Sequence, residues 1–316
     1  MSSSCATRRP PPLGRLFDVE GRRLMLHRSG KGGPTVVFLP GAGLVGLDYL
    51  NIHEQAARFT TSVIYDRGGT GWSDDVALPR PAAAVAAELR SLLRAAGAPS
   101  PYILVGHSLG GAYARRYAQL FPGEVAGLLL LDPAHEGYDA APRQSVAAQL
   151  RQILAILPVL ANLKGFYRPM FERMLAAWPD DVRKQLVEYH LRAWRRGLQE
   201  AKTLSTDVMT ELRGGGGRPE APMIVLTAMG IDPFMAAFAA EPYLRELNTL
   251  KRDFYDAFAR SAPRGEAREV MDAGHSTLHT DRPDAVVAAL RDLLAATTAS
   301  RGDQMACKPG SVPLPA

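Results

Sequence analysis

Cysteine is nearly absent from this chain of 316 residues, which contains two, Cys5 and Cys307. Both lie near the chain ends, and neither belongs to a CxxC pair or to the Cys/His spacing typical of zinc sites. We therefore expect no disulfide framework, no metal and no cofactor. Hydrophobic residues make up 47% of the chain and charged residues 22%, so a large core can form without such cross-links.

Long hydrophobic runs are absent as well. The longest apolar stretch, residues 153–161, is too short to cross a bilayer and contains Pro158. Near the N-terminus, Arg8 and Arg9 are followed by three prolines instead of an apolar segment, so the sequence predicts no signal peptide. These features favour a cytoplasmic protein without a membrane span.

The chain also lacks a long basic run. Its 37 basic and 32 acidic residues give a net charge of +5, and part of that excess comes from the chain ends. Elsewhere both signs are interspersed, and no basic stretch is interleaved with aromatic residues as in nucleic-acid-binding segments. We expect a small apolar molecule as the partner rather than nucleic acid, and the oligomeric state stays open.

What the chain does contain is an alternation of short β-rich apolar runs with helical patterns. A hairpin is expected at 16–19 and 23–28, further strands at 35–39, 62–65, 102–105, 126–131, 223–227 and 268–271, and helices near 47–58, 80–96, 109–120, 241–260 and 283–296. Continuous apolar strands of this length suit a parallel sheet buried on both faces, and strand–helix alternation implies right-handed crossovers. The sequence thus predicts an α/β fold with a doubly wound, mostly parallel sheet.

The alternation breaks in the middle of the chain, which predicts an insertion. Residues 137–219 have the pattern of several helices without a strand and end in a run of glycines, 214–217. We expect this segment to form a helical cap, or lid, between the two parts of the core. The predicted boundaries are 1–14 for a disordered tail, 15–136 and 220–298 for the core, and 299–316 for a second disordered tail.

The most informative segment is residues 102–111, where a strand pattern runs into a G-x-S-x-G motif centred on Ser108 and a helical pattern follows. A serine nucleophile needs such a sharp, strained strand-to-helix turn to raise its hydroxyl clear of the sheet. Gly106 and Gly110 remove side chains where strand and helix approach closely. We therefore predict Ser108 as a catalytic nucleophile, with His107 packed beside it and pointing away.

Serine is a poor nucleophile without a base, and two histidines near the end of the chain are candidates. His275 follows a short strand pattern and Gly274, in the loop after the last predicted strand. His279 lies nearer the final helix, which Asp281 is expected to cap, and should be partly exposed. We predict His275 as the base.

Two aspartates could hold the histidine in the right tautomer. Asp232 stands in the loop after the predicted strand 223–227, and Asp132 ends the predicted strand 126–131. The acid of such a triad orients the imidazole and stabilises the imidazolium that forms on it. Chain order and loop position favour Asp232 as the catalytic acid, with Asp132 as the alternative. Asp232 could instead serve as a turn or helix cap, because it precedes a proline.

A loop of small residues follows the first predicted parallel strand, at 40–43. Such a loop can aim a backbone N–H at a substrate oxyanion. We predict an oxyanion hole formed by the N–H groups of Ala42 and of Leu109, which directly follows the nucleophile.

These motifs resemble the α/β-hydrolase superfamily, single-cap type, over residues 16–296. Residues 65–73 look like the D-R-x-G-x-G-x-S loop of that superfamily, whose expected work is to shape the site floor through turns and charge pairs. Pro40 departs from the pattern, because many relatives have histidine there. The serine nucleophile argues against haloalkane dehalogenases and epoxide hydrolases, and the elbow differs from the G-G-S-W-G of proline iminopeptidases.

The expected cap is rich in large apolar residues. They are Leu150, Ile153, Leu154, Leu157, Met170, Phe171, Met174, Leu175, Trp178, Tyr189 and Trp194. Most should pack the cap onto the core, and the rest should line an apolar pocket. The resemblance therefore implies a serine hydrolase that forms an acyl-enzyme, with a carboxylic ester of small to medium apolar character as substrate. The alternatives are an acyltransferase or C–C-bond hydrolase with the same triad, or a ligand-binding receptor on this fold.

Overall fold

The computed structural model describes residues 10–137, 162–202, 207–215 and 220–306. The strands are β1 (Arg15–Val19), β2 (Arg22–Ser29), β3 (Thr35–Leu39), β4 (Ser62–Tyr65), β5 (Tyr102–His107), β6 (Val125–Leu131), β7 (Met223–Ala228) and β8 (Gly265–Val270). The helices are α1 (Leu50–Ala56), α2 (Ala82–Ala95), α3 (Leu109–Leu120), α5 (Leu163–Met174), α6 (Asp180–Ala201), α7 (Asp207–Gly214), α8 (Glu241–Ser261), α9 (Leu278–Asp281) and α10 (Pro283–Ala306). Two short 3-10 turns, Gly46–Tyr49 and Pro122–Glu124, complete these elements.

The eight strands form one sheet in the order β1-β2-β4-β3-β5-β6-β7-β8. The hairpin β1–β2 and the pair β2–β4 are antiparallel, and all remaining neighbours are parallel. β5 and β6 lie side by side at the centre, with β7 next to β6. The predicted α/β fold with a mostly parallel sheet is confirmed, and the carboxyl ends of β5, β6 and β7 meet at one edge, where ligands of such sheets bind.

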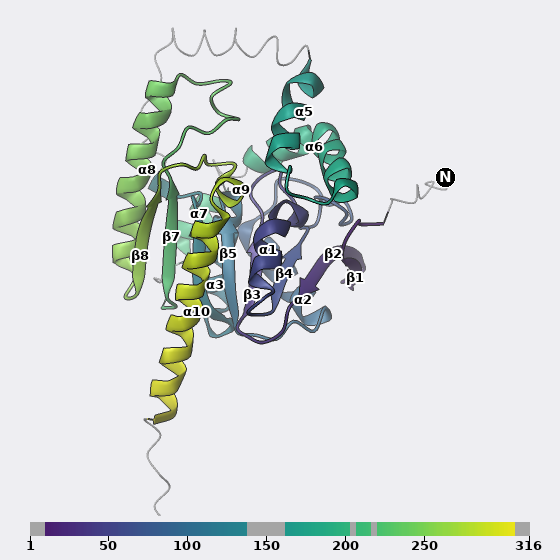
Figure 1. The fold of residues 1–316 in the computed structure, drawn as a ribbon. Helices are drawn as coiled ribbons and strands as arrows, with labels where there is room; N and C mark the ends of the chain where they lie inside the picture. Colours follow the sequence, from purple (N-terminus) through teal and green to yellow (C-terminus); the bar gives the residue numbers. More distant parts are fainter. Residues whose placement is uncertain (1–9, 138–161, 203–206, 216–219, 307–316) are drawn as a thin grey trace, which may run out of the picture.

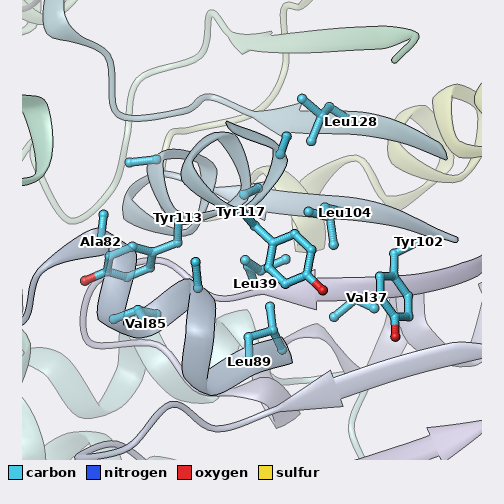
Figure 2. Packing of buried hydrophobic residues seen from close by; sticks show 14 of the residues in the cluster. Val37, Leu39, Ala82, Val85, Leu89, Tyr102, Leu104, Tyr113, Tyr117 and Leu128 are labelled. Atoms are coloured by element: carbon cyan, nitrogen blue, oxygen red, sulfur yellow. The ribbon is translucent and has the colours of Figure 1, made fainter. Parts of the chain in front are cut away.

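Helices cover both faces of the sheet (Figure 1). Alternate residues of each central strand enter two separate cores, as the two-residue period of a strand requires. Figure 2 shows one of them, in which Val37, Leu104 and Leu128 pack against α2 and α3. On the opposite face, strand residues such as Phe38 and Val105 belong to the same cluster as residues of α1 and α10. The strands are thus held from both sides, which fixes the loops at their carboxyl ends.

Helices α5 and α6 pack against each other and lie across the top of the sheet in Figure 1. Trp178, which lies between them, donates its indole N–H to the carbonyl of Leu47 at 2.7 Å, and His190 of α6 bonds to the carboxylate of Asp48 at 2.8 Å. Both contacts fasten these helices to the segment that follows β3. The described residues of the expected cap, 162–202 and 207–215, contain no strand.

Helix α7 also falls within the expected cap, but it packs on α2 and α3 of the core. The carboxylate of Glu211 accepts the backbone N–H groups of Ala82 and Ala83 at 2.9 and 2.8 Å, where α2 begins. A carboxylate at this position satisfies N–H groups that have no partner within the helix. α7 therefore extends the core, while the apolar positions 150, 153, 154 and 157 lie outside the described residues, as do two of the four glycines.

Several element boundaries differ from the sequence prediction, and two of them are informative. β8 begins at Gly265 and ends at Val270, earlier than expected, because it pairs with β7 along its whole length. Helix α10 continues to Ala306, into the segment 299–316 that we expected to be a disordered tail. Residues 299–306 contain no proline, the residue that most strongly ends a helix.

Candidate active site

Ser108 sits at the junction of β5 and α3 in strained backbone. Its φ of 50° and ψ of −120° place it in a region that L-residues rarely adopt. A Cβ at Gly106 would meet Gly110 O at 2.6 Å, and a Cβ at Gly110 would overlap the backbone of Leu39. The two glycines therefore let strand, helix and the neighbouring strand β3 approach closely, as the motif predicts. This geometry leaves the serine hydroxyl at the carboxyl edge of the sheet.

The structure brings Ser108, His275 and Asp132 together in one hydrogen-bonded chain. His275 Nε2 lies 3.0 Å from Ser108 Oγ, and His275 Nδ1 lies 2.5 Å from Asp132 Oδ2. His275 reaches the serine from the loop between β8 and α9. The three groups come from sequence positions far apart, and the sheet order β5-β6-β7-β8 brings them to the same edge.

Asp132 follows directly after β6 and has no solvent exposure. Its Oδ1 accepts the backbone N–H of Ala228 at 3.0 Å, while its Oδ2 accepts the Lys251 ammonium at 2.8 Å in addition to His275. Burial alone would raise the pKa of this carboxyl, but Lys251 and His275 outweigh it and hold the pKa below its ordinary value. Asp132 is thus kept as a carboxylate although water cannot reach it.

Asp232, which we expected to orient the histidine, does not contact its ring. One carboxylate oxygen of Asp232 accepts the N–H groups of Phe234 and Met235 at 2.9 and 2.8 Å, and the other accepts the N–H of Ser276 at 2.5 Å. Asp232 therefore caps its own turn and ties it to the loop that carries His275. The geometry corrects our assignment: the histidine's partner is Asp132, the alternative.

The correction has a simple physical origin. β6 is the strand next to β5, so a residue that directly follows β6 lies beside the elbow. Asp132 has a φ of 43°, and this turn directs its carboxylate away from the line of the strand. Asp232 lies further along its loop, where backbone N–H groups occupy both of its oxygens. The sequence signal that could have found Asp132 was its place immediately after a buried strand.

Lys251 is a site residue that our sequence analysis missed. It lies in α8, 4% exposed, and also donates to the carbonyl of Ala228 at 3.1 Å. In a helix rich in charged residues, sequence offers no sign that this particular lysine points inward. A buried lysine needs a paired charge, and Asp132 provides it.

The two other histidines near the site have packing roles. His107 is buried, with Nδ1 at 2.6 Å from the Tyr49 hydroxyl and Nε2 at 2.8 Å from the His275 carbonyl. Burial and the neighbouring His275 lower its pKa to about 4, so it is neutral near pH 7. His279 was expected to be partly exposed, which is wrong: it is fully buried and its ring stacks on Tyr49 at 4.4 Å.

The loop after β3 passes close to the elbow. A Cβ at Gly41 would lie 3.4 Å from Ser108 Cβ, and the Gly41 N–H donates to the Tyr49 hydroxyl at 3.1 Å. Within the part of the chain that the structure describes, the N–H groups of Ala42 and Leu109 donate no hydrogen bond. Leu109 is the first residue of α3, where an N–H has no partner within the helix. These two groups can therefore donate to a ligand at the serine.

The D-R-x-G-x-G-x-S loop supports the floor of the site. Asp66 accepts the N–H groups of Gly46 and Trp72 at 2.8 and 2.9 Å, and burial raises its pKa to about 7. Gly71 N–H donates to the Tyr189 hydroxyl of α6 at 2.8 Å, and the rings of Trp72 and Tyr189 stack. The loop thus joins the core to the helices above it.

Aromatic side chains gather where α5 meets the loop after β7. Tyr167 and Phe171 of α5 lie 6.1 and 5.3 Å, between ring centroids, from Phe234. All three are partly exposed, and Phe234 lies two residues beyond Asp232. Met174 and Trp178, in contrast, are buried. The half-buried aromatics are therefore better candidates for contact with a ligand than the residues that dock the helices.

A separate cleft of about 730 Å³ lies between α6 and the D-R-x-G-x-G-x-S loop. Lys184, Glu188 and Arg196 are among its lining residues, and none of the lining residues belongs to the chain Ser108–His275–Asp132. Arg196 is paired with Asp75 at 3.2 Å. We therefore do not place the reacting part of a ligand there.

The described part of the chain offers neither a metal site nor a membrane span. Those residues contain no group of three or more His, Cys, Asp or Glu that could hold a metal ion. No helix among them is long and apolar enough to cross a membrane.

The chain matches a family model and one relative along most of its length, and other relatives over a shorter part. The family model described as the alpha/beta hydrolase family matches residues 36–289. YbdG, an uncharacterized protein of Bacillus subtilis, is 29% identical over 289 residues, which cover 86% of this chain and 83% of YbdG. A second uncharacterized protein of that organism, YqjL, is 36% identical over 112 residues, 34% of this chain and 43% of YqjL.

Solved structures show the same architecture. A thermophilic esterase from Thermogutta terrifontis superposes with a TM-score of 0.59 at 21% identity, covering 89% of this chain and 98% of its own. A putative epoxide hydrolase from Pseudomonas aeruginosa gives 0.64 at 21% identity, covering 92% and 99%. At such identities the likeness shows the fold alone. The family match extends over most of the chain and includes both Ser108 and His275, so the chain belongs to the alpha/beta hydrolase family.

Proposed function

We propose that the protein is a serine hydrolase that uses Ser108 as nucleophile, His275 as general base and Asp132 as the acid of the triad. The observation that carries the proposal is the continuous chain from Ser108 Oγ through His275 Nε2 and Nδ1 to Asp132 Oδ2, with distances of 3.0 and 2.5 Å. Such a chain is the arrangement that activates a serine for attack on a carbonyl.

In the first half of the reaction, Ser108 Oγ attacks the substrate carbonyl carbon and its proton passes to His275 Nε2. Asp132 holds Nδ1–H and stabilises the positive charge that develops on the ring. The tetrahedral oxyanion then accepts hydrogen bonds from the N–H groups of Ala42 and Leu109. His275 then gives its proton to the leaving oxygen, the carbon–oxygen bond breaks, and an acyl group remains on Ser108.

In the second half, water attacks the acyl-enzyme. His275 takes a proton from the water as it adds to the carbonyl carbon, and returns a proton to Ser108 Oγ as the carboxylic acid leaves. The enzyme is regenerated without any redox change. No step needs a group beyond the triad, the two backbone N–H groups and water.

A carboxylic ester of small to medium apolar character is the substrate class that fits the surroundings best. The half-buried rings of Tyr167, Phe171 and Phe234 present apolar surface close to the loop that Asp232 ties to His275. An apolar pocket with a few polar groups at the reacting atoms is the usual form of such a site. We expect this surface to exclude water from the bound ester, which would strengthen the oxyanion contacts.

The test combines a fluorophosphonate probe with a panel of p-nitrophenyl esters. The proposal expects the probe to label Ser108 in the wild-type protein and not in Ser108→Ala, and it expects turnover of at least the short-chain esters. Labelling without turnover of any ester would contradict ester hydrolysis and favour an acyltransferase, a C–C-bond hydrolase or a binding protein. No labelling in a folded protein would contradict the serine mechanism itself.

A further inference from the structure

Cap helix α6 makes direct backbone contact with the loop that carries Ala42. A Cβ placed on Gly43 would meet the Cα of Gly197 at 3.1 Å, and a Cβ placed on Gly197 would meet the Cα of Gly43 at 2.9 Å. Each glycine therefore allows the other's backbone to approach. Gly43 also has a φ of +73°, which a larger side chain would adopt only with strain.

Glu200, three residues after Gly197 and so on the same side of α6, reaches into this loop. Its Oε2 accepts the backbone N–H of Gly43 at 2.8 Å, and its Oε1 accepts both Nε and Nη2 of Arg67 at 3.1 and 3.0 Å. Both side chains are almost fully excluded from solvent, at 4% and 1% exposure. The carboxylate of a cap helix thus binds the backbone of the candidate oxyanion loop.

Arg67 completes the arrangement from the other side. It donates through Nη1 to the carbonyl of Pro40 at 2.6 Å and through Nη2 to the carbonyl of Gly41 at 3.0 Å. Its planar guanidinium fixes two successive carbonyls and the Glu200 carboxylate in one geometry. The peptide that contains the N–H of Ala42 begins at the Gly41 carbonyl, so the direction of that N–H is set by the bond from Arg67.

Each neighbouring N–H of the loop has a partner, which leaves the N–H of Ala42 available to a ligand. Gly41 N–H donates to Tyr49, Gly43 N–H to Glu200, and Leu44 N–H to the Gly41 carbonyl. A buried ion pair is a costly way to hold a loop, because both charges lose their hydration. An apolar contact would stabilise the docked helix equally well. What the ion pair of Glu200 and Arg67 adds is a fixed direction of the loop backbone.

We propose that Glu200 is a positioning residue of the oxyanion hole, and that the hole is complete only when helix α6 is docked on the loop. The inference rests on the proposed function, since it assigns Ala42 N–H to the substrate oxyanion. Glu200 touches no reacting atom and acts through Gly43 and Arg67. The cap would then take part in catalysis through the backbone of the core, in addition to any contact with substrate.

The test is Glu200→Gln, with Glu188→Gln as the matched control on the same helix. Gln keeps the size of Glu200 but turns one of its two acceptors into a donor, which must face either Gly43 N–H or Arg67. Glu188 pairs with Arg168 at the surface, and among the described residues its side chain forms no hydrogen bond or ion pair with residues 40–44. A misplaced oxyanion donor weakens binding of the transition state more than binding of the ester substrate. We therefore expect kcat to fall about tenfold to hundredfold, with KM changed by about twofold or less. The control should keep both constants.

Gly197→Ala is an independent route to the same result. Its methyl group would lie within 2.9 Å of Gly43 Cα, so helix and loop must separate while Glu200 and Arg67 are retained. This variant should show the same loss in kcat, and it provides the test if Glu200→Gln does not fold. A folded Glu200→Gln or Gly197→Ala protein with wild-type kcat, or with a loss confined to KM, would overturn the proposal.

A spectroscopic measurement separates this inference from the proposed function. In the ¹⁵N-labelled protein, the amide proton of Gly43 should move upfield in Glu200→Gln, because a neutral acceptor replaces a carboxylate. It should stay in place in Glu188→Gln. An unchanged Gly43 amide contradicts the positioning role whether or not the enzyme cleaves esters. A wild-type protein without ester turnover contradicts the proposed function, even if the amide shifts as expected.

Discussion

Replacing Asp132 with asparagine should remove nearly all activity, and the contacts of this side chain show why. Three donors converge on its two oxygens: Ala228 N–H on Oδ1, and Lys251 and His275 on Oδ2. Asparagine offers one oxygen and one NH₂ group, so in either orientation a donor meets a donor. With the amide toward His275 the ring is driven into the tautomer that carries its proton on Nε2, where it cannot accept the proton of Ser108.

The size of the effect can be estimated from these contacts. The wrong tautomer in a serine triad costs about ten-thousandfold in kcat, which corresponds to about 5 kcal/mol in the activation free energy. The same change leaves Lys251 buried beside a neutral group. Removing one partner of a buried ion pair costs about 3–5 kcal/mol in the free energy of unfolding. We therefore expect Asp132→Asn to be nearly inactive and clearly less stable than the wild type.

Asp232→Asn is the matched control, because Asp232 is the acid that sequence alone favours. Its oxygens accept only backbone N–H groups, those of Phe234, Met235 and Ser276. With the amide oxygen toward Phe234 and Met235, the variant loses one bond, to Ser276. The loss in kcat should be about tenfold or less, because His275 keeps its partner and the loop that carries it only loosens.

The assay is kcat/KM on p-nitrophenyl acetate for both variants, with folding checked by circular dichroism and thermal unfolding. The reasoning would be refuted if Asp232→Asn were the more damaging change in a folded protein. It would also fail if Asp132→Asn retained more than about a hundredth of the wild-type activity, since a tautomer change leaves far less than that.

Three further predictions follow from the same contacts. Ser108→Ala should lose about a millionfold in kcat and keep its thermal stability, measured by ester turnover and unfolding; substantial remaining turnover would contradict the nucleophile assignment. Lys251→Met should raise the pKa of Asp132. Asp132 in the wild type stabilises the fold above the unfolded-state pKa of aspartate and loses this contribution as pH falls. The difference in Tm between wild type and Lys251→Met should accordingly be larger near pH 7 than below about pH 4, where the wild type begins to lose the contribution of Asp132. A difference that grows on acidification would contradict this prediction. Tyr167→Ala should change kcat/KM for octanoate more than for acetate p-nitrophenyl esters, while Trp178→Phe, which loses its bond to Leu47, should lower Tm and affect both esters alike. Equal losses on both esters in Tyr167→Ala would show that the aromatic cluster only supports the fold.

Sequence alone predicts the sheet, the elbow and the base, because each has a local signal. Apolar runs that alternate with helical periods define the strands of a parallel sheet. A strand, a G-x-S-x-G motif and a helix in succession define the position of Ser108. His275 is recognisable because a single loop after the last strand carries it. The structure places both residues within hydrogen-bonding distance, as the sequence analysis expected.

Long-range pairing explains what the sequence leaves open. The acid could be Asp132 or Asp232, since the loops after β6 and β7 begin at the same edge of the sheet. The choice depends on which of the two carboxylates already accepts hydrogen bonds from backbone N–H groups. Lys251 and Glu200 lie on amphipathic helices among other charged residues, so their inward direction becomes visible only when α8 and α6 are packed. His279 was misjudged for the same reason, because burial beneath Tyr49 depends on the segment after β3.

The boundary of the expected cap is a further case. Residues 207–214 continue the helical pattern of the insertion, yet they form α7 on the core beside α2 and α3. A helical period specifies which face of a helix is apolar, but it does not specify which element packs against that face. Glu211, whose carboxylate accepts the first N–H groups of α2, is the contact that fixes the partner here.

The central claim is that Ser108 carries the acyl group during turnover, and one measurement tests it directly. The protein is mixed with p-nitrophenyl acetate, quenched in acid within the first turnover, digested and analysed by mass spectrometry. We expect one acetylated peptide, with the acetyl group on Ser108, and its disappearance in His275→Ala. Ester turnover with no acetyl group on Ser108, or with the acetyl group on another residue, would contradict the account.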